Sequence, residues 1–148
     1  MLGAVLLATE MASAQPVLTE IETRYVQART AEREARFADA ESAYRSLTKG
    51  LPREVLADVR RRRARMLVKL ERCTQAIALM SQVSSTSRSD RVAIAECHRK
   101  SRRFREALNT LEAIRADGRE DADLLLRIAE MHVALRSLAQ ARTLLTQV

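Results

Sequence analysis

Aromatic residues are scarce in this sequence, which has two Tyr, two Phe and no Trp among 148 residues. Only three Gly and two Pro interrupt it, so few positions demand a turn or break a helix. Strand signals are also missing: no run alternates β-branched or aromatic residues with polar ones, and Asp117-Gly118 is flanked by helical patterns. These absences disfavour a β-sandwich or β-barrel and favour helix throughout.

The sequence also lacks the groupings on which catalysis depends. No Gly-rich phosphate loop, paired-carboxylate motif or grouping of serine, histidine and aspartate stands out, so we expect no enzymatic activity and no cofactor. The two histidines, His98 and His132, share one repeat register, which would place them about 10 Å apart by ordinary helix packing. That spacing is too wide for a zinc site, so we expect core histidines and no metal.

A pattern of large, alanine, large and large residues recurs four times at spacings that share one helix face. Its alanines are 36, 31 and 34 residues apart, the length of one two-helix repeat, and a second column of alanines lies twelve residues before them. Each alanine is expected to be a packing notch for a neighbouring helix. The four copies are Phe37, Ala40, Tyr44, Leu47; Cys73, Ala76, Met80, Val83; Phe104, Ala107, Leu111, Ile114; and Leu138, Ala141, Leu145, Val148, and the second column is Ala28, Ala64, Ala95, Ala129.

Start and stop signals divide this pattern into eight helices in four hairpins. Thr19 and Glu22 form a capping box for the first helix, Gly50 supplies a left-handed stop, Pro52 starts the third helix, and Asp90 is the expected N-cap of the fifth. The limits of the other expected helices follow from the positions of the repeat pattern. The expected ranges are 19–35, 37–49, 53–70, 73–83, from 90 onward, 104–115, 121–135 and 138–148.

Over residues 19–148 the chain resembles a tetratricopeptide-repeat protein. In that family the first helix of each pair carries a large apolar residue beside a small one, as Ile94-Ala95 does here, and a proline often closes the unit, as Pro52 does. Gln27 and Arg63 depart from the pattern, and the glycine often found between paired helices is missing. The resemblance implies an all-α, right-handed superhelical stack of antiparallel helix pairs, with repeats over 19–50, 53–84, 90–116 and 121–148.

The resemblance also implies a binding surface, the concave face lined by the first helix of each pair. In this register the face is mostly basic, although Glu96 also lies on it, and planar guanidinium groups bind carboxylates well. We therefore expect a non-catalytic adaptor that holds an acidic peptide segment, with a merely solvated basic face as the alternative. The candidate groove residues are Tyr25, Arg29, Arg33, Arg61, Arg65, Lys69, Arg99 and Lys100.

Other partners fit the net charge of +7 as well. Nucleic acid is disfavoured, because the run Arg60–Arg63 fans through more than a helical turn and only Tyr25 is left for base stacking. An anionic envelope surface stays an alternative partner. A structural assembly module is the alternative function, with helix 138–148 docking on a partner or on a second copy because its apolar edge lacks a covering helix.

The N-terminal residues and the cysteines indicate export. Residues 1–14 read as a secretory signal peptide cut after Ala14, which leaves a repeat domain over 15–148 in the periplasm of a bacterial envelope or outside the cell. A frayed amphipathic N-terminus and a cytoplasmic location are the alternatives. Cys73 and Cys97 would meet if helices four and five are antiparallel, and we expect either a disulfide or two small core residues.

Overall fold

A computed structural model describes residues 20–118 and 120–148, and these residues form helices and connections without any strand. The all-α class is therefore confirmed. The predicted signal peptide and the Thr19 capping box lie outside the described residues. The helices are the first helix (20–33), α2 (Phe37–Ser46), α3 (Arg53–Lys69), α4 (Cys73–Met80), α5 (Arg88–Lys100), α6 (Phe104–Ala116), α7 (Ala122–Ala134) and α8 (Leu138–Leu145).

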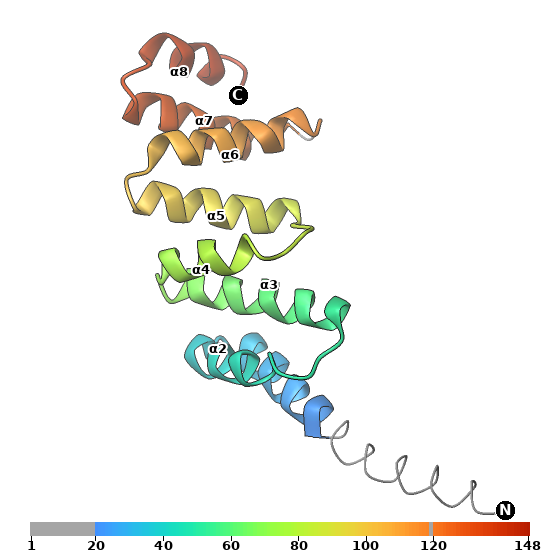
Figure 1. Cartoon of the computed structure of the whole chain (residues 1–148). Helices are drawn as coiled ribbons and strands as arrows, with labels where there is room; N and C mark the ends of the chain where they lie inside the picture. Colours follow the sequence, from blue (N-terminus) through green and yellow to red (C-terminus); the bar gives the residue numbers. More distant parts are fainter. Residues whose placement is uncertain (1–19, 119) are drawn as a thin grey trace, which may run out of the picture.

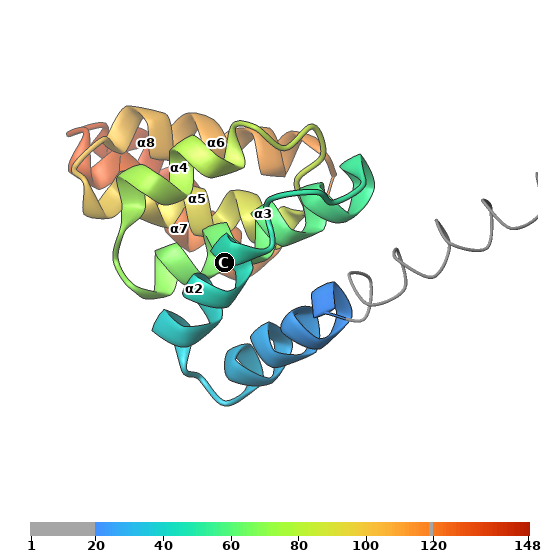
Figure 2. The same cartoon turned by 60° about the horizontal axis from the view of Figure 1, so that its bottom comes forward.

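The helices stack in chain order into an elongated molecule, with the first helix at one end and α8 at the other (Figure 1). Each helix from α2 onward packs against the next, and α3 also contacts α5 across α4. A view turned by 60° shows the first helix and α2 set at an angle to the later helices (Figure 2). None of the helices in the described residues is long and apolar enough to cross a membrane.

The turns inside the four hairpins repeat one geometry. At each turn a non-glycine residue takes a positive φ, between 57° and 63°, and these residues are 36, 31 and 34 positions apart, as the alanines are. The following N–H returns to a carbonyl five residues back, as from Arg103 to His98 at 2.8 Å, which is a Schellman motif. The four residues with positive φ are Ala35, Glu71, Arg102 and Arg136, so none of these turns uses a glycine.

The alanine columns pack as the sequence predicts. All eight alanines are at most 3% exposed, and Ala107 is completely buried beside the buried Leu111 and the half-buried Phe104. Three apolar clusters follow one another along the stack, the first joining the first helix, α2 and α3, the second α3 to α5, and the third α5 to α8. A small side chain at each notch lets neighbouring helices approach closely enough to form these clusters.

The fourth copy of the pattern is only partly buried, which corrects the expectation for α8. Leu138, Leu145 and Val148 are 64%, 50% and 57% exposed, whereas Ala141 and Leu144 face the core. In the first three copies the next hairpin covers this face. Among the described residues no helix packs on the outer side of α8, so its apolar side chains meet solvent.

Four helix limits also differ from the predictions. Ser87, not Asp90, is the N-cap of α5, and Asp90 is the acid of a reciprocal capping box three residues later. Asp90 is fully buried, because α3 supplies a cationic partner for it. Gly50 has a φ of 79°, but α2 already ends at Ser46. The last turns of α4 and α8 unwind, ending at Met80 and Leu145.

Candidate peptide-binding groove

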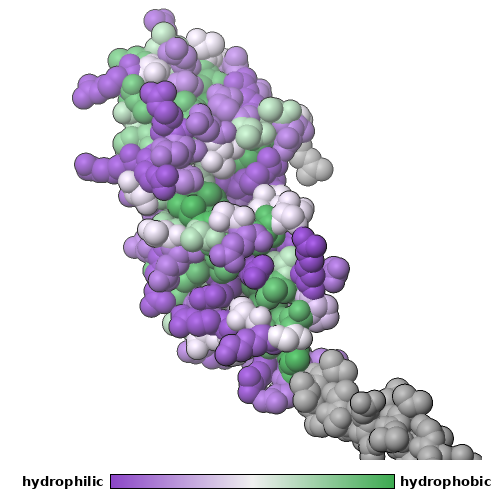
Figure 3. Space-filling view, in the orientation of Figure 1, coloured by the Kyte–Doolittle hydropathy of each residue, from purple (hydrophilic) through white to green (hydrophobic). Residues whose placement is uncertain are grey.

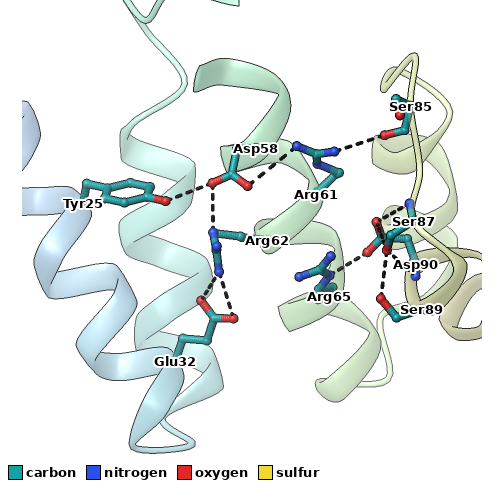
Figure 4. A network of polar contacts seen from close by, with 10 residues as sticks. All are labelled: Tyr25, Glu32, Asp58, Arg61, Arg62, Arg65, Ser85, Ser87, Ser89 and Asp90. Atoms are coloured by element: carbon teal, nitrogen blue, oxygen red, sulfur yellow. Dashed lines mark hydrogen bonds and ion pairs between the residues drawn. The ribbon is translucent and has the colours of Figure 1, made fainter. Parts of the chain in front are cut away.

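The residues of the predicted groove lie on the first helix, α3 and α5, and Figure 4 shows three of them, Tyr25, Arg61 and Arg65. Tyr25 is held there by two contacts: its hydroxyl donates to Asp58 Oδ2 at 2.9 Å, and its ring meets Tyr44 edge to face with centroids 6.3 Å apart. A tyrosine fixed in this way presents a rigid ring edge rather than a mobile side chain.

Asp58, Arg62 and Glu32 extend this contact into a network between the first helix and α3 (Figure 4). Arg62 donates from Nε to Asp58 Oδ2 at 2.9 Å and from Nη1 to Glu32 Oε2 at 3.2 Å. Tyr44 donates to the same Glu32 oxygen at 2.6 Å, and burial together with this bond raises the pKa of Tyr44. Burial raises the pKa of Asp58, but bonds from Arg62 and Tyr25 outweigh it, so the net pKa is lowered.

Arg65 and Asp90 make the corresponding link between α3 and α5. The Nε of Arg65 donates to Asp90 Oδ1 at 2.6 Å, and the backbone and hydroxyl of Ser87 donate to Oδ2 at 3.0 and 2.8 Å. Burial alone would raise the pKa of Asp90, and the bonds from Arg65 and Ser87 lower it below its usual value. The carboxylate is thus ionised and fully enclosed, while the Arg65 side chain is 36% exposed.

Arg63, which stands where the repeat pattern leads one to expect a large apolar residue, binds a buried carboxylate. Arg63 Nε donates to Glu41 Oε1 at 2.7 Å, and Arg45 pairs with the other oxygen of the same carboxylate. Glu41 is only 2% exposed, so an ion pair replaces the apolar contact between α2 and α3. Burial raises the pKa of Glu41, but its two arginine partners outweigh this, and the net shift is downward.

The remaining groove cations divide into paired and unpaired groups. Arg99 holds Glu96 with two nitrogens at 2.8 and 2.5 Å, Lys100 Nζ lies 2.7 Å from Glu71, and Arg29 Nε lies 3.7 Å from Glu32. Arg61 bonds the Ser85 carbonyl at 3.3 Å and lies 3.8 Å from Asp58.

Only two of the predicted cations, Arg33 and Lys69, are without an acidic partner in the described residues. Arg33 bonds the Thr30 hydroxyl at 3.3 Å, and Lys69 is exposed. The groove is therefore a mixed surface in which carboxylates fix most of the arginines. Sequence reasoning did not predict that Glu32, Asp58 and Asp90 pair with arginines of α3, although Asp58 stands four residues before Arg62, a spacing typical of helical ion pairs.

The two cysteines and the two histidines take no part in the ion-pair network described above. Cys73 and Cys97 form a disulfide with their Cα atoms 5.1 Å apart, joining the start of α4 to the end of α5. The Nδ1 atoms of His98 and His132 are buried without a hydrogen-bond partner in the described residues, and burial lowers the pKa of His98. Within the part of the chain that the structure describes, no group of three His, Cys, Asp or Glu residues could hold a metal ion.

No protein-family model matches the chain, and no curated protein matches it significantly.

Proposed function

We propose that this chain is a tetratricopeptide-like, right-handed superhelical stack that acts as a non-catalytic adaptor and holds an acidic segment of a partner protein. The line of arginines on consecutive first helices carries this proposal. In this proposal, successive helix pairs turn their first helices toward one face. Figure 4 shows Arg62 and Arg65 on α3, where Arg62 binds Glu32 of the first helix and Arg65 binds Asp90 of α5. The matching spacings of the Schellman turns and of the alanine columns support the repeat architecture.

The internal acids orient these arginines for a ligand. A guanidinium has five N–H donors, and Arg65 uses its Nε for Asp90 while its side chain stays 36% exposed. Its terminal nitrogens donate no hydrogen bond within the described residues, so a partner carboxylate can accept from them. Because Asp90 fixes the side chain, Arg65 loses less conformational freedom when it binds than a free surface arginine would.

The unpaired cations allow this proposal to be tested without damage to the fold. We would select short randomised peptides, displayed on phage, against the wild-type chain and against a variant with both Arg33→Glu and Lys69→Glu. Peptides rich in Asp and Glu should be enriched on the wild type, and the double variant should bind them at least about tenfold more weakly. Arg105→Glu and Arg142→Glu, at exposed positions on α6 and α8, make the matched control.

Two results would contradict the groove as the binding surface. Either the enriched peptides carry no excess of acidic residues, or the groove variant and the control variant bind them equally. Superimposable thermal melts by circular dichroism would show that all three chains are folded alike.

We propose export to a bacterial envelope as the setting, because the Cys73–Cys97 disulfide persists in an oxidising compartment.

The exposed apolar face of α8 supports self-assembly as a second function. Leu138, Leu145 and Val148 leave that face open, and none of the three is needed for the core. A concentration-dependent dimer in light scattering that Leu138→Ser and Leu145→Ser abolish would establish it. A monomer at every concentration would reject it.

A further inference from the structure

The face of α3 that carries Arg60 differs from its counterparts in the neighbouring repeats. The repeat spacing places Arg24, Arg60 and Arg91 in one column. Arg24 binds Glu20 at 2.5 Å, and Arg91 binds Asp117, which lies just beyond α6. Arg60 makes no ion pair or hydrogen bond in the described residues. Repeat two has Leu56 where repeat one has Glu20, and Ser84-Ser85-Thr86 where repeat three has its acid.

A cleft opens beside this unpaired arginine. It lies between the first half of α3 and the connection from α4 to α5, and its volume is about 550 Å³. Arg53, Arg60 and Arg61 supply three cations against the single acid Glu54, and Ala57 leaves room at the floor. Arg53 is also unpaired in the described residues. Gln82 with the hydroxyls of Ser84 and Ser85 adds neutral donors, so the cleft suits an anion.

The neighbouring repeat shows which anion fits. At the open end of the third hairpin, Asp117 binds Arg91, and Asp121 binds Arg88 at 2.6 Å. A carboxylate on a short aliphatic side chain therefore fits this position of the repeat. In repeat two the chain offers no such group, and a carboxylate from another molecule can take its place.

An apolar pocket lies on the other side of α3, at the open end of the first hairpin. Its volume is about 510 Å³, and its lining is almost wholly apolar, with Val26 and Val55 61% and 41% exposed. The space-filling view shows hydrophobic side chains breaking the polar surface in this lower part of the molecule (Figure 3). The lining residues that matter here are Ile21, Val26, Leu47, Leu51, Pro52 and Val55.

The two sites flank the same helix. Pro52 and Val55 line the apolar pocket, and the intervening Arg53 lines the basic cleft. A helix is about 10–12 Å across with its side chains, and an extended peptide advances about 3.3 Å per residue. A segment crossing the start of α3 would thus reach both sites with side chains three or four positions apart.

We propose that the start of α3 is a bipartite site for a peptide with one large apolar side chain and, three or four residues away, an Asp or Glu. The apolar side chain fills the Val26 and Val55 pocket, and the carboxylate binds Arg60 with Arg53. This inference rests on the proposed adaptor function and names a second contact region for the same acidic partner.

Affinity measurements on the enriched peptides test the site. Val55→Ser, Arg60→Gln and Ser85→Asp should each weaken binding about tenfold, the last because it supplies the missing acid beside Arg60. Ser85→Asn, Leu138→Ser and Arg105→Gln are the matched controls and should change affinity less than about twofold. In a peptide whose acidic residue is replaced by Gln, Arg60→Gln should lose its effect, since the double-mutant cycle then has no pair to break.

The outcomes separate this inference from the adaptor proposal. Peptides that need Arg33 and Lys69 but tolerate Val55→Ser, Arg60→Gln and Ser85→Asp overturn the bipartite site and leave the groove standing. Enriched peptides without an apolar residue three or four positions from an acid also overturn it. If no peptide is enriched, the adaptor proposal falls and the bipartite site falls with it.

Discussion

Removing the cation from the Arg65–Asp90 pair should destabilise the chain in a way that depends on pH. In the wild type Asp90 is fully buried, and Arg65 with Ser87 holds its pKa below the usual value. This pair therefore contributes stability above the unfolded-state pKa of about 3.9, and the contribution is lost as pH falls through the lower folded pKa. Arg65→Gln leaves an enclosed carboxylate with only the Ser87 bonds, so burial then raises its pKa.

The two single substitutions should differ in cost. Arg65→Gln strands a buried charge, for which about 3 kcal/mol is typical, or a fall in melting temperature of about 10 °C for a chain of this size. Asp90→Asn strands Arg65 instead, but that side chain is 36% exposed and water can solvate it. We expect about 2 kcal/mol there, for the lost charged hydrogen bonds.

Urea denaturation at about pH 7, 5 and 3.5 would measure both free energies of unfolding. The Arg65→Gln loss should shrink as pH falls, because a protonated Asp90 has no charge left to pair. The double variant should cost less than the sum of the two single substitutions, with a coupling energy of about 1 kcal/mol or more. A loss that is equal at every pH, or additive in the double variant, would refute the assignment of this stability to charge pairing.

Four further predictions concern the rest of the fold. Replacing Cys73 and Cys97 together by alanine should cost about 3 kcal/mol in urea denaturation and abolish any effect of reductant; sensitivity to reductant that survives would mean that the disulfide is not its source. Arg102→Gly should be neutral or raise stability by up to about 1 kcal/mol, and Arg102→Val should lower it, because φ there is 59°; the reverse order in thermal melts would contradict the left-handed turn. Ala107→Leu should cost about 1–3 kcal/mol by overpacking, whereas an unchanged melt would mean that the notch has spare room. Glu41, whose pKa is lowered, should contribute stability above about pH 4.3 that disappears as pH falls further, so an acid titration of Glu41→Gln should converge with the wild type.

Core packing was predictable from this sequence because the same packing pattern recurs in every repeat. Every notch alanine is buried, and the helix starts at Phe37, Arg53, Cys73 and Phe104 agree with the structure. Helix ends were less predictable, since the turns after α4 and α8 unwind without any local signal such as Gly or Pro. The burial of the outer apolar face of α8 depends on whether a further helix packs on it, and the periodicity within α8 does not contain that information.

Charge pairing was not predictable from the register, because the partners come from different helices. Arg63 occupies an apolar column, and a cation there requires a partner, yet the partner Glu41 lies 22 residues earlier and one position after a notch alanine. Residues that share a column can also be paired in one repeat and unpaired in the next, as Arg91 and Arg60 are.

Repeats that share one packing pattern but differ in charge pairing indicate where a ligand would bind. The alanine notches impose the same close approach in every repeat, so the columns that build the core have little freedom to differ. The column of Arg24, Arg60 and Arg91 is at least partly exposed and can differ in its partners without loss of the stack. An arginine that has no internal acid, although its equivalents in other repeats do, keeps its N–H donors available for a ligand. Arg60 fits that description, and the adjoining apolar pocket gives the same place a source of affinity that does not depend on charge.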